Sequence, residues 1–158
     1  ILVAASGNDG TDNILYPARY STVIAVGAID ENDNLASFSS YGFEQELVAP
    51  GVDINSTSLN NQYSISSGTS LAAPHAAGAA ALIKSYNNSL TNEQIRAKLR
   101  NDALDLGTAG KDDLFGYGLV QVKLNTTNYT LINLSYFYAI FNISNFWLPN
   151  ISYNFWLN

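Results

Sequence analysis

The stretch from residue 68 to residue 86 constrains the fold more than any other part of the chain. Gly68 leads a turn into Thr69 and Ser70, and small or apolar residues then continue nearly all round a helix. The pattern is carried by Ala72, Ala73, Ala76, Ala77, Ala79, Ala80, Ala81 and Leu82. It predicts a helix that starts at or just after Ser70 and ends near Tyr86. A helix that is apolar on every side is expected inside a protein, with other elements packed around it.

Elsewhere the chain alternates short β-branched runs with turn clusters. We expect strands at residues 1–5, 23–28 and 46–49. A second, amphipathic helix should begin at Thr91, because Gln94 stands at the capping-box spacing and Ile95 and Leu99 share one face. Strands and helices in this order predict an α/β layer architecture with a mostly parallel sheet.

The composition changes after Lys123, because none of the remaining residues is charged and asparagine and aromatic residues dominate. We therefore predict two regions, a folded domain over residues 1–124 and an uncharged tail over residues 125–158. The tail could form strands that pack on the domain or on a partner. So many exposed aromatic residues would also promote aggregation. A third interpretation is that the tail is not a genuine translated segment.

The remaining composition excludes several classes of function. The formal net charge is -6 and the basic residues are scattered, which argues against nucleic acid as a partner. The chain has no cysteine, so a disulfide framework and thiolate chemistry are excluded. No stretch reaches the roughly 20 apolar residues that cross a bilayer, so we expect no membrane span.

Ser70 is the residue whose position carries chemistry. A hydroxyl at a helix N-terminus lies beside unpaired N–H groups and the positive end of the helix dipole, which stabilise an oxyanion. This position suits a nucleophile for acyl transfer. The alternative is that Ser70 is only an N-cap, the usual role of a serine before a helix.

Two motifs around Ser70 and Asn8 resemble motifs of a known enzyme family. Residues 68–75 resemble the active-site serine signature of the subtilisin-like proteases (subtilases), G-T-S-x-A-x-P-H. Residues 4–8 are similar to the family's A-A-x-G-N segment, whose asparagine amide, here Asn8, points into the oxyanion hole. The resemblance extends over residues 16–20, 23–28 and 36–51. It implies a three-layer subtilisin-like α/β fold, of which the chain would hold only the C-terminal half.

The resemblance also implies a function. The chain is expected to belong to a serine endopeptidase that acts on proteins or peptides, needs no cofactor and is secreted or held at the cell surface. Ser70 would be the nucleophile and Asn8 an oxyanion donor. The family's aspartate and histidine would lie upstream of Ile1, so the missing N-terminal half of the same chain is an expected partner. The chain as given is therefore expected to be inactive.

The only histidine of the chain, His75, is not expected to replace the missing base. It lies five positions after Ser70, which on a regular helix is about 7.5 Å along the axis and about 140° around it. We expect a buried helix histidine that is satisfied by hydrogen bonds.

Substrate and ion sites follow from the same resemblance. Ala5, Ser6, Gly7 and Leu15 would line the pocket for the side chain before the scissile bond, and a leucine there predicts small or medium apolar side chains. Some relatives hold a weak cation, such as Ca²⁺, at positions equivalent to Glu44, Glu46 and the carbonyls of Ala18, Tyr20 and Val23. The alternative for the two glutamates is that they are solvated surface acids.

Two other functions compete with the protease interpretation. The first is a non-catalytic half-subtilase scaffold with a binding or surface-structural role; it would need neither Ser70 nor Asn8. The second is the nucleophile elbow of another acyl hydrolase. That elbow has glycines at both two-residue offsets from the serine, and Ala72 breaks the pattern.

Overall fold

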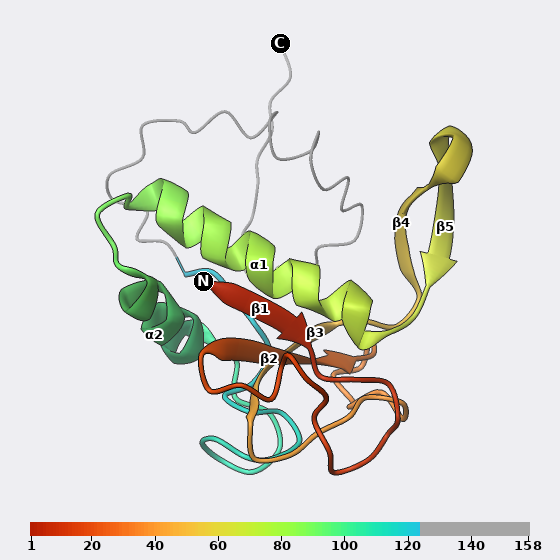
Figure 1. The fold of residues 1–158 in the computed structure, drawn as a ribbon, viewed down its shortest axis with the longest axis horizontal. Coiled ribbons are helices and arrows are strands. Elements are labelled where there is room, and N and C mark those ends of the chain that lie inside the picture. Colours follow the sequence, from red (N-terminus) through yellow and green to blue (C-terminus); the bar gives the residue numbers. More distant parts are fainter. Residues whose placement is uncertain (124–158) are drawn as a thin grey trace.

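The computed structural model describes residues 1–123, and its centre is a three-stranded parallel sheet (Figure 1). Strands β1 (Leu2–Ala5), β2 (Val23–Ile29) and β3 (Gln45–Pro50) lie in that order. All seven residues of β2 are buried, as expected for a central strand of a parallel sheet that is covered on both faces. The three predicted strands and the parallel α/β architecture are confirmed.

Two helices follow the sheet in the chain. Helix α1 (Thr69–Tyr86) lies across the sheet, and α2 (Asn92–Asp102) packs beside it (Figure 1). Thr91 caps α2 in a capping box, because its hydroxyl accepts from the Gln94 N–H and its own N–H donates to the Gln94 side chain. Both predicted helices are confirmed, and α1 starts one residue earlier than expected.

One hydrophobic core joins the sheet to both helices. Alternate residues of β2 point to opposite faces, so Ile24 and Val26 pack with Ile83 of α1 and with Ile95 and Leu99 of α2. A second, smaller cluster lies on the other face of the sheet and contains Ile14, Ala18 and Ala25. The loop between β1 and β2 therefore covers part of the face that the helices leave open.

Helix α1 is not buried on every side, contrary to the expectation from its sequence. Pro74, Ala77 and Ala81 are exposed. Within residues 1–123 no element covers these residues, and Ala77 and Ala81 lie on the flank of the helix that borders β1.

A hairpin that the sequence analysis missed projects beside the start of α1 (Figure 1). It pairs β4 (Ile54–Ser58) with β5 (Gln62–Ser66) in antiparallel register, with a short 3-10 turn at Leu59–Asn61. Asn60 and Asn61 both have positive φ, at 59° and 56°. Asparagine tolerates this backbone region, and the Asn-Asn pair was the one available signal for a tight hairpin turn.

The described chain ends beside α2. The Lys123 N–H donates to Asp102 Oδ2 at 3.1 Å, and the Lys123 carbonyl accepts from Lys98 Nζ at 2.8 Å. The predicted boundary near residue 125 and the tail over residues 125–158 lie outside the described residues. None of the helices in residues 1–123 has the length and apolar content that crossing a membrane requires.

Candidate active site

Ser70 lies in the first turn of α1, at the end of a short turn anchored to the sheet. The Gly68 N–H donates to the Gly51 carbonyl at 2.7 Å, directly after the end of β3, and the Leu71 N–H donates to the Gly68 carbonyl. Gly68 is the N-cap residue and Ser70 is exposed. The N-cap interpretation of Ser70 is therefore wrong, because the helix begins before it.

Asn8 is brought to the same turn by hydrogen bonds from Thr69. The Thr69 N–H donates to Asn8 Oδ1 at 2.9 Å, and the Thr69 hydroxyl donates to the same oxygen at 2.8 Å. The Gly7 N–H in turn donates to the Thr69 hydroxyl at 3.3 Å. Since Oδ1 is held by a buried threonine, the Asn8 amide nitrogen is directed away from Thr69. Sequence analysis did not single out Thr69, although it lies inside the serine motif.

Gly68 keeps open a small space between Ser70 and Asn8. A Cβ atom on Gly68 would stand 3.2 Å from Ser70 Oγ and 3.4 Å from Asn8 Nδ2. A hydroxyl and an amide donor thus border one space at the N-terminus of a helix. This is the arrangement that stabilises a negatively charged oxygen beside a serine under acylation.

The predicted pocket residues are gathered beside Asn8, with one exception. The Leu15 side chain lies over Gly7, where a Cβ atom would come within 2.9 Å of Leu15 Cγ. Leu15 is 39% exposed, and Ala5 is the last residue of β1, two positions before Gly7 in the chain. Ser6, however, is fully buried, and its N–H and carbonyl are bonded to Val26 and Leu15. Ser6 therefore positions this loop and presents no surface to a ligand, which corrects the sequence prediction.

His75 lies on α1 with the expected hydrogen bond, but it is half-buried rather than fully buried. Its Nδ1 lies 2.9 Å from the Leu71 carbonyl oxygen, one turn back along α1. Burial lowers the pKa of His75, and the hydrogen bond to Leu71 opposes this only in part. The imidazole is thus held against the preceding turn of α1 at Leu71.

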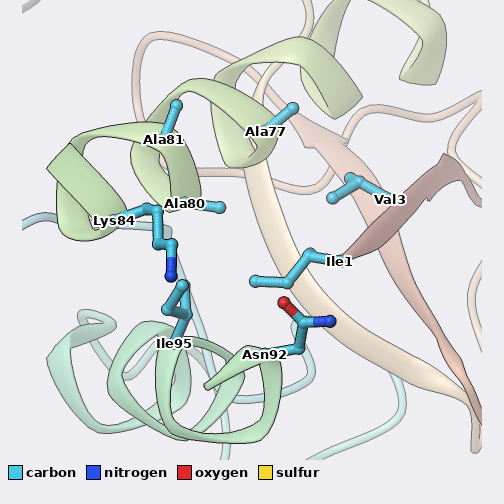
Figure 2. Close-up of a pocket in the computed structure, with 8 residues that line it drawn as sticks. All are labelled: Ile1, Val3, Ala77, Ala80, Ala81, Lys84, Asn92 and Ile95. Atoms are coloured by element: carbon cyan, nitrogen blue, oxygen red, sulfur yellow. The ribbon is translucent and has the colours of Figure 1, made fainter. Parts of the chain in front are cut away.

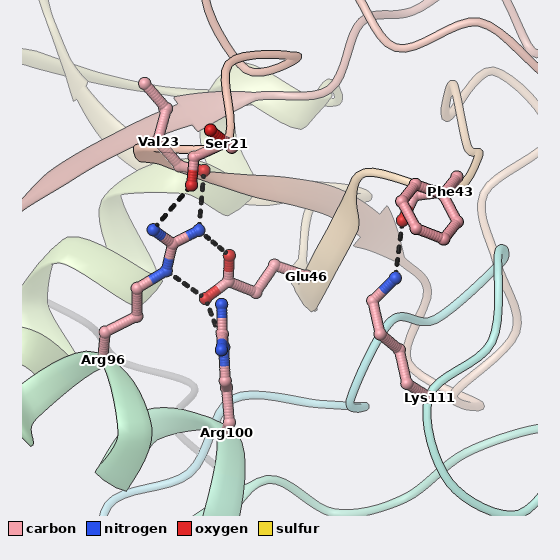
Figure 3. Close-up of polar contacts among 7 residues, drawn as sticks. All are labelled: Ser21, Val23, Phe43, Glu46, Arg96, Arg100 and Lys111. Carbon is pink, nitrogen blue, oxygen red and sulfur yellow. Dashed lines mark hydrogen bonds and ion pairs between the residues drawn. The ribbon is translucent and has the colours of Figure 1, made fainter. Parts of the chain in front are cut away.

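Glu46 forms a buried ion cluster that the sequence analysis missed (Figure 3). Its side chain is 4% exposed, and Oε1 accepts from Arg96 Nε at 2.8 Å and from Arg100 Nε at 2.9 Å. Arg96 Nη2 donates to Oε2. Burial alone raises the pKa of Glu46, but the hydrogen bonds and charges of the two arginines outweigh it and leave the pKa below its usual value.

The expected cation site at Glu44 and Glu46 does not fit this geometry. Both oxygens of Glu46 are taken by arginines, and the Val23 carbonyl accepts from Arg96 Nη2 at 3.2 Å. Glu44 pairs with Arg19 at 3.4 Å. Across residues 1–123 no group of three or more His, Cys, Asp or Glu side chains is placed to hold a metal ion. The alternative is also wrong for Glu46, which is buried rather than solvated.

A groove of about 260 Å³ lies away from this site, between β1, α1 and α2 (Figure 2). The side chains of Ile1, Ala80 and Ile95 turn toward the same space. Its full lining is Ile1, Val3, Ala77, Ala80, Ala81, Lys84, Asn92 and Ile95. The groove is apolar apart from Lys84 and Asn92, and neither Ser70 nor Asn8 borders it.

Comparison with protein families identifies the scaffold. Residues 1–118 match the model described as the subtilase family. The chain belongs to the subtilase family. The matched region contains Asn8, Leu15, Thr69 and Ser70, so the whole candidate site lies within the family's fold.

Three relatives show how similar this subtilase chain is to individual proteins. It is 53% identical over 129 residues to the "Minor extracellular protease Epr" of Bacillus subtilis, covering 81% of this chain and 20% of the relative. It is 51% identical over 126 residues to "Subtilisin BL" of Lederbergia lenta, covering 80% and 46%. It is 49% identical over 126 residues to "Alkaline elastase YaB" of a Bacillus species, covering 80% and 32%. The chain therefore matches less than half the length of each of these relatives.

Proposed function

We propose that this subtilase chain carries the nucleophile and one oxyanion donor of a secreted serine endopeptidase. The observation that carries the proposal is the shared space beside Gly68, bordered by Ser70 Oγ at 3.2 Å and Asn8 Nδ2 at 3.4 Å from the same point. Family membership over residues 1–118 supports the reaction class. The names of the relatives, which include an extracellular protease and a subtilisin, support protein substrates and secretion.

The residues have distinct roles in this reaction. Ser70 Oγ attacks the carbonyl carbon of a peptide bond, and the carbonyl oxygen becomes an oxyanion. Asn8 Nδ2 and the N-terminal dipole of α1 stabilise that charge. The C–N bond then breaks, the amine leaves with a proton, and water hydrolyses the acyl-serine. Thr69 acts through Asn8 by holding its Oδ1.

The general base is proposed to come from outside this chain. A serine hydroxyl is a weak nucleophile at neutral pH without an adjacent base. The chain has one histidine, His75, and it is bonded to Leu71 on α1. We therefore assign the catalytic histidine and aspartate to an upstream part of the same protein, and expect the 158-residue chain alone to be inactive.

Two exposed features offer a place for that upstream part. Strand β1 is at the edge of the described sheet, and Ile1 and Leu2 are exposed there. The groove beside Ile1 is lined by the uncovered apolar face of α1 (Figure 2). A further strand on β1 would satisfy its free backbone groups and cover this face.

Labelling and hydrolysis test the proposal on the native, full-length gene product. A fluorophosphonate probe should modify Ser70, and Ser70→Ala should abolish both labelling and peptide hydrolysis. In subtilisin itself the loss on removing the serine is on the order of 10⁶-fold. Ser85→Ala is the matched control, because Ser85 lies on the same helix and its hydroxyl donates to the carbonyl of Leu82 in the preceding turn.

Two results together would contradict the proposed function. A native product without an upstream histidine and aspartate, with no labelling at Ser70, would reject the protease and favour the non-catalytic scaffold. The intact mass and the N-terminal peptide of that product show whether it contains an upstream histidine and aspartate.

A further inference from the structure

Four oxygen atoms surround the guanidinium of Arg96 at the edge of the sheet (Figure 3). Arg96 Nη1 donates to the Ser21 carbonyl at 2.9 Å, and Nη2 donates to the Val23 carbonyl at 3.2 Å. Arg96 Nε and Nη2 also bind the two oxygens of Glu46. Two backbone carbonyls and a carboxylate are the ligands that hard cations such as Ca²⁺ prefer.

The guanidinium suits this set of oxygens better than a point charge would. Its planar fork carries five N–H donors in fixed directions, and it is permanently charged. From α2 it reaches the loop before β2 at Ser21, the first residue of β2 at Val23, and Glu46 in β3. One side chain thus ties three elements together.

The positive charges of the two arginines already exceed the negative charge of Glu46, so no net negative charge remains here to attract a metal ion. Glu46 brings one negative charge, whereas Arg96 and Arg100 bring two positive charges to its oxygens. Arg100 is also stacked over the Tyr117 ring at 5.1 Å from its centroid. The nearby Tyr20 carbonyl accepts from the Val23 N–H at 2.9 Å. A metal ion would have to displace one arginine and approach the other.

We propose that Arg96 replaces a bound cation at this point, so that the docking of α2 on the sheet does not depend on Ca²⁺ or Na⁺. The inference concerns stability and is independent of the proposed protease activity. It also explains why the site expected from the resemblance does not fit the cluster: Arg96 occupies both oxygens of Glu46 and the carbonyl of Val23, which were expected to hold the ion.

Thermal unfolding of the full-length protein tests this, in a Ser70→Ala background that prevents self-digestion. Melting is followed with a chelator and with calcium or sodium chloride at matched ionic strength. The response of the parent records any ion site elsewhere in the full-length protein. Arg96→Gln should melt lower than the parent with the chelator, and calcium should raise its melting temperature by about 2–4 °C more than it raises that of the parent, because the vacated oxygens then accept the ion.

Lys98→Gln is the matched control. It makes the same kind of change on the same helix, but the partners of Lys98 are Asp102 and the Lys123 carbonyl, both at 2.8 Å, rather than Glu46. Calcium should change the melting temperature of this variant by the same amount as it changes that of the parent. A parent that calcium stabilises as much as it stabilises Arg96→Gln, or an Arg96→Gln protein that calcium does not stabilise, would overturn the proposal.

A second measurement needs no variant at Arg96. Backbone amide resonances of residues 21–23 and 46 in the parent are followed by NMR during a calcium titration. Unchanged positions support the replacement of the cation by Arg96, and a saturable shift at these residues contradicts it. This measurement decides the question even if Arg96→Gln does not fold.

Discussion

Thr69 fixes the orientation of Asn8 through two hydrogen bonds to one oxygen, at 2.9 Å from its N–H and 2.8 Å from its hydroxyl. The two residues are 61 positions apart in the chain. An asparagine side chain has one acceptor end and one donor end. Because Thr69 offers two donors, the acceptor end of Asn8 must face it, and the donor end is left for the space beside Ser70.

Thr69→Val should therefore lower kcat in the full-length enzyme by about 5-fold, with little change in KM. The reason is that one hydrogen bond of about 1 kcal/mol no longer restrains the oxyanion donor. Thr69→Ser restores the hydroxyl and should recover most of the rate. Steady-state kinetics on a peptide substrate give both constants. Equal rates for the valine and serine variants would show that the hydroxyl does not position Asn8.

Leu15→Ala should shift substrate preference toward large side chains before the scissile bond. Leu15 lies over Gly7, so its removal deepens the proposed pocket by several carbon atoms. The ratio of kcat/KM for phenylalanine over alanine at that position should rise about 10-fold or more. Leu104→Ala is the control, since Leu104 is 42% exposed against 39% for Leu15 and lies just beyond α2. A parent enzyme that already prefers phenylalanine would refute the pocket assignment.

His75 should make the folded protein less stable as the pH falls below about 6.5, the ordinary pKa of histidine. Burial lowers the pKa of His75 in the folded state. The unfolded chain therefore binds this proton first, and stability is lost as the pH falls from the ordinary pKa through the folded pKa. His75→Gln should remove this component of the pH dependence, measured as melting temperature against pH, and leave kcat unchanged. A large loss of kcat would mean that His75 acts in the chemistry.

Much of the fold was predictable from neighbouring residues. The buried β2 run, the start of α2 at Thr91 and the alanine-rich α1 were all read from periodicity and capping signals, because these depend on residues within a few positions of one another. The hairpin was missed because β4 and β5 are polar and exposed. Their strand state comes from pairing with each other rather than from a buried face.

The sequence by itself determined the family motifs, the order of the three sheet strands and the two helices, and the choice of Ser70 and Asn8 as candidate site residues. Only the tertiary structure decided the partners of Glu46, which lie 50 and 54 positions away at Arg96 and Arg100. It also decided that Ser6 is buried and that Thr69 holds Asn8. The physical reason is that helix and strand signals are local, whereas the burial and pairing of a polar side chain depend on which distant elements pack against it.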